Sequence, residues 1–147
     1  MIIIQEHPLI INQLILNFKS DNPLIGAVVT FQGYVRDFDN TLNGSIKYLE
    51  IEFYEEMTKK ELKKIEETAK KKWKLIDITI IHRFGRVSLN EPIVCIMVAS
   101  KHRHDAFDAC RFIIDYLKIQ APFWKKEVSR NHSSWVEQKK SDLVKVK

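Results

Sequence analysis

The chain has 147 residues, a formal net charge of +5 and a hydrophobic content of 45%. This length and composition are typical of one compact domain, so residues 1–147 are expected to fold as a single unit. The apolar stretch at residues 9–18 contains Asn12, Gln13 and Asn17 and is too short to span a bilayer. Neither a membrane span nor a signal peptide is therefore expected, and the basic excess favours an anionic partner or ligand.

Both cysteines lie inside apolar runs, IVCIMVA for Cys95 and AFDACRFII for Cys110, and not in a CxxC or Cys/His spacing. They are expected to pack as small buried hydrophobic groups. This use of cysteine suits a reducing compartment, so a cytoplasmic location is expected.

The first third of the chain predicts a strand, a helix and a pair of strands. Residues 1–6 predict a short strand, and residues 8–19 predict a helix that has proline in its first turn. Residues 24–36 are rich in valine, isoleucine and phenylalanine, which predicts a long strand. A turn-forming segment at 37–45 links it to the alternating residues 46–54. The two strands are therefore expected to form an antiparallel pair.

An amphipathic surface helix is predicted at residues 58–73, with its many lysines on the solvated face. Thr58 and Glu61 have the spacing of a capping box, which places the start of the helix there. Two strands follow at 76–83 and 92–100. The second has almost no polar residue and should be central in its sheet.

A turn around Gly85 and Asn90 is expected between those two strands. A third helix is predicted at 105–117 with the aspartate at its start as its cap, and Pro122 forbids its continuation. Two short strands with aromatic residues and a charged tail from about residue 140 follow, the tail expected to fray. The order predicts an α+β domain with three helices and a mostly antiparallel sheet.

The motifs of common nucleotide sites are absent, because none of the four glycines forms GxGxxG or GxxxxGK. Basic residues instead stand at the predicted ends of elements, where rigid neighbours can aim them into one concave site. There they could clamp a phosphate or carboxylate. The alternative is that they are solvated charges, or for Lys118 a cap that complements the helix dipole. These residues are Arg36, His102, Arg103, Lys118, Lys125 and Lys126.

Two other site types were weighed from the same residues. His102 and His104 beside Asp105 lack a clear further ligand, so no metal site is expected. Aromatic and basic residues alternate around Trp124 and Lys126 as in single-strand nucleic-acid binders, but one such cluster without an RRM or OB pattern is thin evidence. Burial of Trp124 in the core is expected instead.

Six segments together resemble the molybdopterin synthase large-subunit family: GAVVTFQGYVRD, EFYEEM, IIHRFGRV, VASKHRHDAF, DYLKIQAPFWKKE and the tryptophan of SSWVEQKK. They cover residues 25–139 in unbroken order. The resemblance implies an α/β hammerhead fold and a homodimer of this chain within a heterotetramer. The other subunit would be a small ubiquitin-like sulfur carrier that ends in Gly-Gly.

The implied activity is that of a sulfurtransferase in molybdenum cofactor biosynthesis. Sulfur would pass from the C-terminal thiocarboxylate of the small subunit to cyclic pyranopterin monophosphate and form the dithiolene of molybdopterin. No cofactor, metal or nucleic acid is implied. A basic nucleic-acid-binding module and a catalytically silent scaffold of the same fold remain as alternatives, which salt-dependent retention on DNA and an activity measurement would separate.

The resemblance also implies roles for individual residues. Lys118 and Lys125 look like the catalytic lysines, and Lys118 is expected to meet the carbonyl of the partner's tail while Lys125 assists proton transfer. The residues that would hold the pterin and its phosphate are Arg36, His102, Arg103 and, after the tryptophan, Lys139. The dimer could supply some of these from the opposite subunit.

The channel for the partner's tail would be lined by Phe31 and Lys126. For Phe31, a place in the core is an equally good interpretation.

Overall fold

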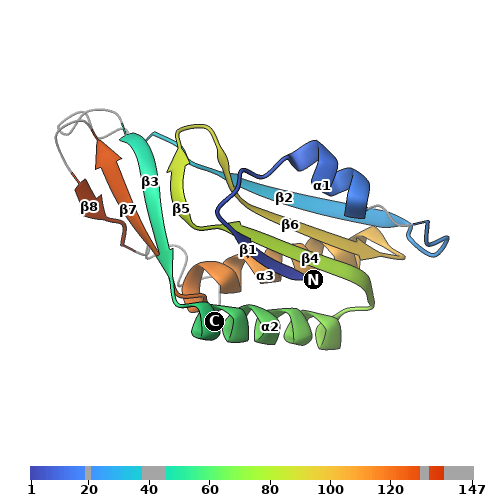
Figure 1. Ribbon diagram of the computed structural model, residues 1–147. Coiled ribbons are helices and arrows are strands. Elements are labelled where there is room, and N and C mark those ends of the chain that lie inside the picture. Colours follow the sequence, from blue (N-terminus) through green and yellow to red (C-terminus); the bar gives the residue numbers. More distant parts are fainter. Residues whose placement is uncertain (19–20, 38–45, 130–132, 138–147) are drawn as a thin grey trace.

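The computed structural model describes residues 1–18, 21–37, 46–129 and 133–137. The elements in these ranges are, in chain order, β1 (Ile2–Gln5), α1 (Ile11–Phe18), β2 (Ala27–Tyr34), β3 (Ile46–Phe53), α2 (Glu55–Lys72), β4 (Leu75–Arg83), β5 (Gly85–Ser88), β6 (Pro92–Ser100), α3 (Arg103–Gln120), β7 (Phe123–Ser129) and β8 (Ser133–Trp135). The three helices and two mostly antiparallel sheets confirm the predicted α+β class (Figure 1).

The first sheet, sheet A, has the strand order β1-β4-β6-β2. Its only parallel pair is β1 with β4, while β6 pairs antiparallel with β4 and with β2. The central place predicted for residues 92–100 is confirmed, since β6 lies between two strands and is buried from Ile93 to Ser100. An apolar run is stable there because both faces of the strand are covered.

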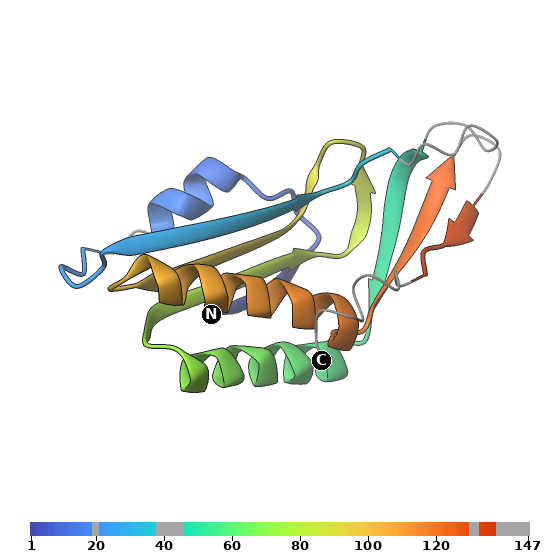
Figure 2. The same cartoon turned by 180° about the vertical axis from the view of Figure 1, so that it is seen from behind.

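Helices cover sheet A on both faces. Helices α2 and α3 lie on one face and α1 on the other, as the two opposite views show (Figures 1 and 2). Successive residues of β6 accordingly belong to different cores. Ile96 packs with α2 and α3, and Cys95 and Met97 pack with α1. This period of two explains why one strand contributes to both cores.

The second sheet, sheet B, has the order β5-β3-β7-β8 and stands at one end of sheet A (Figure 1). The predicted pairing of residues 24–36 with 46–54 is wrong, because β2 pairs with β6 and β3 pairs with β5 and β7. The chain instead crosses from one sheet to the other, and Val35 is buried in the core of sheet B. Adjacent β patterns in sequence do not determine partners when a second sheet competes for them.

Strand β5 replaces the turn predicted between β4 and β6. Gly85 and Asn90 do adopt positive φ angles of 77° and 67°, so both are turn residues as expected. Gly85 is the first of the four residues that pair with β3, and Val87 among them is fully buried. A strand this short between two turn signals carries too little alternation to be recognised.

The three predicted helix starts are also wrong. Helix α1 begins at Ile11, so Pro8 precedes its first turn. Helix α2 begins at Glu55 with Tyr54 as its N-cap, and α3 begins at Arg103 with His102 as its N-cap; neither cap residue makes a side-chain cap hydrogen bond. Thr58 is fully buried inside α2, where its hydroxyl donates to the Pro122 carbonyl oxygen at 3.2 Å. Its polarity therefore serves a tertiary contact and not a capping box.

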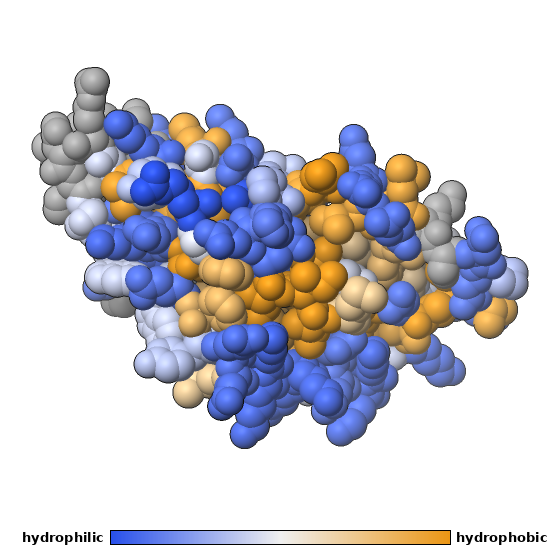
Figure 3. All heavy atoms as spheres, in the orientation of Figure 1, coloured by the Kyte–Doolittle hydropathy of each residue, from blue (hydrophilic) through white to orange (hydrophobic). Residues whose placement is uncertain are grey.

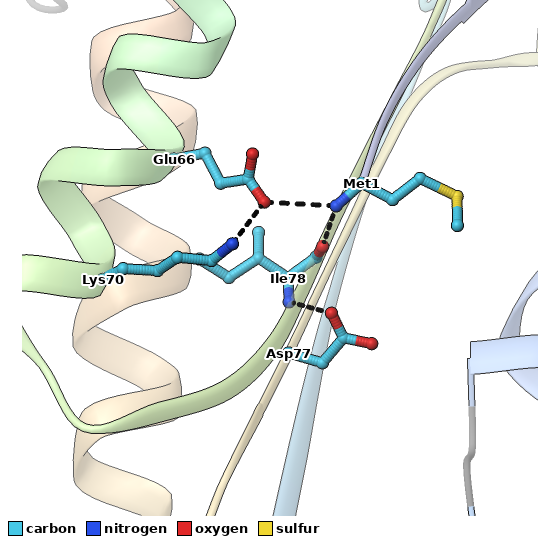
Figure 4. Close-up of polar contacts among 5 residues, drawn as sticks. All are labelled: Met1, Glu66, Lys70, Asp77 and Ile78. Carbon is cyan, nitrogen blue, oxygen red and sulfur yellow. Dashed lines mark hydrogen bonds and ion pairs between the residues drawn. The ribbon is translucent and has the colours of Figure 1, made fainter.

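The outer face of α2 is hydrophilic, as predicted for its lysines (Figure 3). Toward sheet A, Glu66 accepts from Lys70 at 2.9 Å and from the Met1 ammonium at 3.2 Å, and that ammonium also donates to the Ile78 carbonyl at 2.6 Å (Figure 4). Burial raises the pKa of Glu66, but these two cations lower it by more, so it is below its ordinary value. None of the helices in the described ranges is long and apolar enough to cross a membrane.

Candidate functional site

A cavity of about 320 Å³ lies where sheet A, sheet B and the end of α3 meet. Its size is within the usual range for small-molecule pockets. Most of its wall is apolar, from residues of β2, β6 and α3. The polar and aromatic side chains that line it are Phe31, Tyr34, Arg36, His82, Lys118, Phe123, Lys125 and Glu137.

Strand β2 brings the first two of these residues to the cavity. Gly33 is needed here, because a Cβ atom at this position would lie 2.8 Å from Cγ1 of Val94 on the neighbouring strand. An irregularity in the β2–β6 register follows between Gly33 and Tyr34. It redirects the chain, so that Val35 is buried while Arg36 remains exposed at the cavity.

The turn after α3 brings the two lysines together. Helix α3 runs along sheet A and ends beside the start of β7 (Figure 2). The Ala121 N–H donates to the Leu117 carbonyl at 3.2 Å to close the helix, and Pro122 prevents another turn. The chain then reverses into β7. Lys118, exposed in the last helical turn, and the half-buried Lys125 therefore line the same cavity.

His82 is the cavity residue that sequence reasoning missed as part of a site. It stands near the end of the apolar strand β4 and is 1% exposed, and its ring stacks on Phe123 with centroids 3.7 Å apart and an interplanar angle of 11°. Burial, and then the charge of Lys125, lower its pKa to about 3. The imidazole is therefore neutral at physiological pH. The available signals were its place in the segment IIHRFGRV and the interruption of an apolar strand by a polar residue.

The tautomer of His82 follows from its partner. Nδ1 lies 2.7 Å from the backbone carbonyl oxygen of Arg83. Because a carbonyl oxygen only accepts, Nδ1 carries the proton in the neutral ring, and Nε2 is left as an acceptor.

His102 and Arg103 do not reach this cavity within one chain. They stand at the start of α3, and the rise of an α-helix puts them about 24 Å from Lys118 at its end. Both are exposed. Any contribution of these two residues to the cavity requires a second copy of the chain.

Lys126 lies outside the cavity, and Trp124 lies outside the core. Lys126 does not line the cavity, because neighbours on a strand point to opposite faces, and its ammonium lies 5.8 Å from the Trp135 ring centroid. Trp124, predicted to be buried, is 45% exposed and contacts Tyr54 edge to face. Lys139 lies outside the described residues.

The arrangement suits an anionic small molecule. Two lysines and one arginine provide positive charge against one carboxylate, Glu137, while the rings of Phe31 and Phe123 offer flat surfaces. Among the described residues, no three His, Cys, Asp or Glu side chains come together as metal ligands. Fold and cavity together describe an α+β domain with a small-molecule pocket bordered by cationic side chains.

Comparison with known proteins identifies the family. Residues 4–120 match the family described as MoaE protein. A relative from Pseudomonas aeruginosa, named molybdopterin synthase catalytic subunit, is 48% identical over 123 residues, which are 84% of this chain and 81% of the relative. The chain belongs to the MoaE protein family.

Solved structures agree with this assignment. The molybdopterin synthase structure from Staphylococcus aureus matches with a TM-score of 0.82 and 34% identity, over 91% of this chain and 95% of that one. A chain from a Helicobacter pylori complex of subunits 1 and 2 of molybdopterin-converting factor shares the fold, with a TM-score of 0.79 and 23% identity over 94% and 91%. The family, the fold and the enzyme class implied by the sequence motifs are confirmed.

Proposed function

We propose that the cavity between α3 and β7 is where sulfur passes from a small carrier protein to cyclic pyranopterin monophosphate. The observation that carries this proposal is the convergence of Lys118, Lys125 and Arg36 on one apolar-walled cavity of about 320 Å³. The relatives named molybdopterin synthase catalytic subunit supply the reaction class. The cavity supplies a place for an anionic ring compound.

In this proposal the two lysines have separate tasks. Lys118, which is exposed on the last turn of α3, meets the thiocarboxylate of the carrier and orients its sulfur toward the pterin side chain. Lys125 extends from a paired strand and is half-buried, so it is held more firmly and transfers a proton as the cyclic phosphate opens. Arg36 binds that phosphate, because a guanidinium can hold two of its oxygens.

The carrier's tail is proposed to be a flexible segment that ends in Gly-Gly. A chain without side chains suits a cavity lined by the rings of Phe31 and Tyr34, where a bulkier tail would meet them. The Helicobacter pylori protein of the same fold occurs in a complex of subunits 1 and 2, which supports a two-subunit assembly for this chain. A cytoplasmic location is part of the proposal, and the two buried, unpaired thiols agree with it.

A homodimer would complete the cavity. The separation of about 24 Å along α3 prevents His102 and Arg103 from meeting the Lys118 of the same chain. We therefore assign them to the cavity of a second copy. A mixture of Lys118→Ala and Arg103→Ala chains should regain activity, because mixed dimers contain one cavity with neither substitution. Mixing that restores nothing, although subunits exchange, would contradict this assignment.

The direct test is reconstitution. The chain is mixed with a carrier protein bearing a C-terminal thiocarboxylate and with cyclic pyranopterin monophosphate, and dithiolene product is measured. Product should form with the wild-type chain and should be lost with Lys118→Ala, while binding of the carrier persists. A carrier with an ordinary carboxylate is the negative control. Full turnover by Lys118→Ala would remove the proposed role of this lysine.

A further inference from the structure

His82 occupies a joint between the two sheets. It belongs to β4 of sheet A, where its Cα partners are Ile4 of β1 and Val94 of β6. The ring on which it stacks, Phe123, belongs to β7 of sheet B. The stack therefore connects the sheet that carries α3 and Lys118 with the strand that carries Lys125. Its geometry influences how far apart the two lysines stand.

The ring of His82 is held on two sides. Its Nδ1 donates to the Arg83 carbonyl, and Arg83 is itself anchored, with Nη1 donating to Glu91 at 2.9 Å and Nη2 to the Arg86 carbonyl at 3.2 Å. One face of the ring lies against Phe123. Because the ring lines the cavity and its Nδ1 edge is turned to the backbone, the edge left for the cavity carries Nε2.

Lys125 lies close to that edge. Phe123 and Lys125 are two residues apart on a regular part of β7, opposite Phe53 and Ile51 of β3, so they point to the same face. The charge of Lys125 is one of the causes that lower the pKa of His82, which places the ammonium within electrostatic reach of the ring. A neutral imidazole with an acceptor nitrogen is compatible with a nearby ammonium, while an imidazolium would repel it.

We propose that His82 is a positioning residue for Lys125: its acceptor nitrogen Nε2 attracts and orients the lysine ammonium, while the stack on Phe123 holds β7 in place. This inference rests on the proposed function of Lys125. It adds that a buried, uncharged histidine orients the ammonium group of Lys125, although the histidine itself contacts neither the sulfur nor the phosphate. Loss of that orientation should lower kcat and leave substrate binding nearly intact.

Two variants of similar size separate this role from packing. His82→Gln keeps a planar group that both donates and accepts, whereas His82→Leu keeps the volume and removes both polar contacts. We expect His82→Leu to lose about tenfold or more in kcat with KM for the pterin nearly unchanged, and His82→Gln to recover most of that loss. Unfolding midpoints of both variants show whether each is folded. Equal kcat for two folded variants would overturn the proposal.

A spectroscopic measurement tests the contact without activity. Long-range ¹H–¹⁵N correlation of the histidine rings in the whole protein should show His82 with a proton on Nδ1 and none on Nε2. Lys125→Ala should shift the Nε2 resonance, and Lys126→Ala, on the other face of β7, should not. An Nε2 resonance that ignores Lys125 would overturn the proposal. Failure of the wild-type chain to form product would instead count against the proposed function.

Discussion

The consecutive lysines of β7 allow a sharp test of the cavity. Lys125 lines it, and Lys126 points to the opposite face of the same strand and contacts Trp135. Removing one well-aimed cation from a site of this kind costs ~3 kcal/mol of transition-state stabilisation, which corresponds to a rate loss of about 150-fold. We expect Lys125→Ala to lose activity to this extent. Lys126→Ala should lose no more than about 0.5 kcal/mol of stability, the value of one exposed cation–π contact.

The assay is single-turnover formation of dithiolene with saturating thiocarboxylated carrier, because single turnover excludes differences in product release. Both variants have the same change in net charge and the same strand position to within one residue. General electrostatic attraction of an anionic substrate would therefore affect them alike. Equal losses in the two variants would refute the assignment of the cavity as the site. A large loss confined to Lys126→Ala would place the chemistry on the outer face of sheet B.

Three further predictions concern groups outside the cavity. Thr58→Val should destabilise the protein by about 1 kcal/mol in chemical denaturation, because it keeps the side-chain volume and removes the hydroxyl that donates to the Pro122 carbonyl. Glu66→Gln should lower stability at pH 7 by at most about 1 kcal/mol. The lowered pKa of Glu66 gives stability that is present above its ordinary value of 4.5 and lost as pH falls below it, so urea unfolding of the variant and wild type should converge at acidic pH. Native Cys95 and Cys110 should resist alkylation at pH 8 and react only after unfolding, since burial raises the pKa of each thiol to about 11.

Local patterns predicted much of this fold. The run at residues 92–100 predicted a central strand, and β6 is that strand. The apolar stripe of α3 predicted a helix packed on a sheet, and six of its residues are buried. In both segments the hydrophobic pattern is strong along the whole element. Such a pattern still predicts the element correctly after tertiary packing is added.

The wrong predictions concern segments whose structure is determined by a tertiary contact and not by the local sequence pattern. Thr58 looked like a cap because a hydroxyl three residues before Glu61 usually serves one, but here α2 starts earlier and the hydroxyl bonds to another segment. Strands β2 and β3 looked like a hairpin because a turn-rich segment joins them. No local pattern predicts the second sheet, in which β3 pairs with β5 and β7.

Prediction of the site shows the same limit. Lys118, Lys125, Arg36 and Phe31 were predicted from motifs, and the fold gathers all four at one cavity. Lys126 was predicted with them, but a strand period of two separates it from Lys125. His82 was missed because a motif gives identity and spacing and does not show which polar side chain a sheet-to-sheet contact buries.

The source of sulfur follows from the state of the two thiols. A sulfurtransferase that carries sulfur on its own cysteine needs an accessible thiolate, and such groups have a lowered pKa in an electropositive environment. Cys95 and Cys110 have the opposite properties, since both are buried among apolar side chains and burial raises their pKa. Neither lines the cavity. The sulfur must then arrive on another molecule and enter the cavity already activated. The chain's own contribution is the placement of cations, so Lys118→Ala should abolish turnover and Lys125→Ala should lower it about 150-fold. Substitution of both cysteines by alanine or valine should leave turnover nearly unchanged.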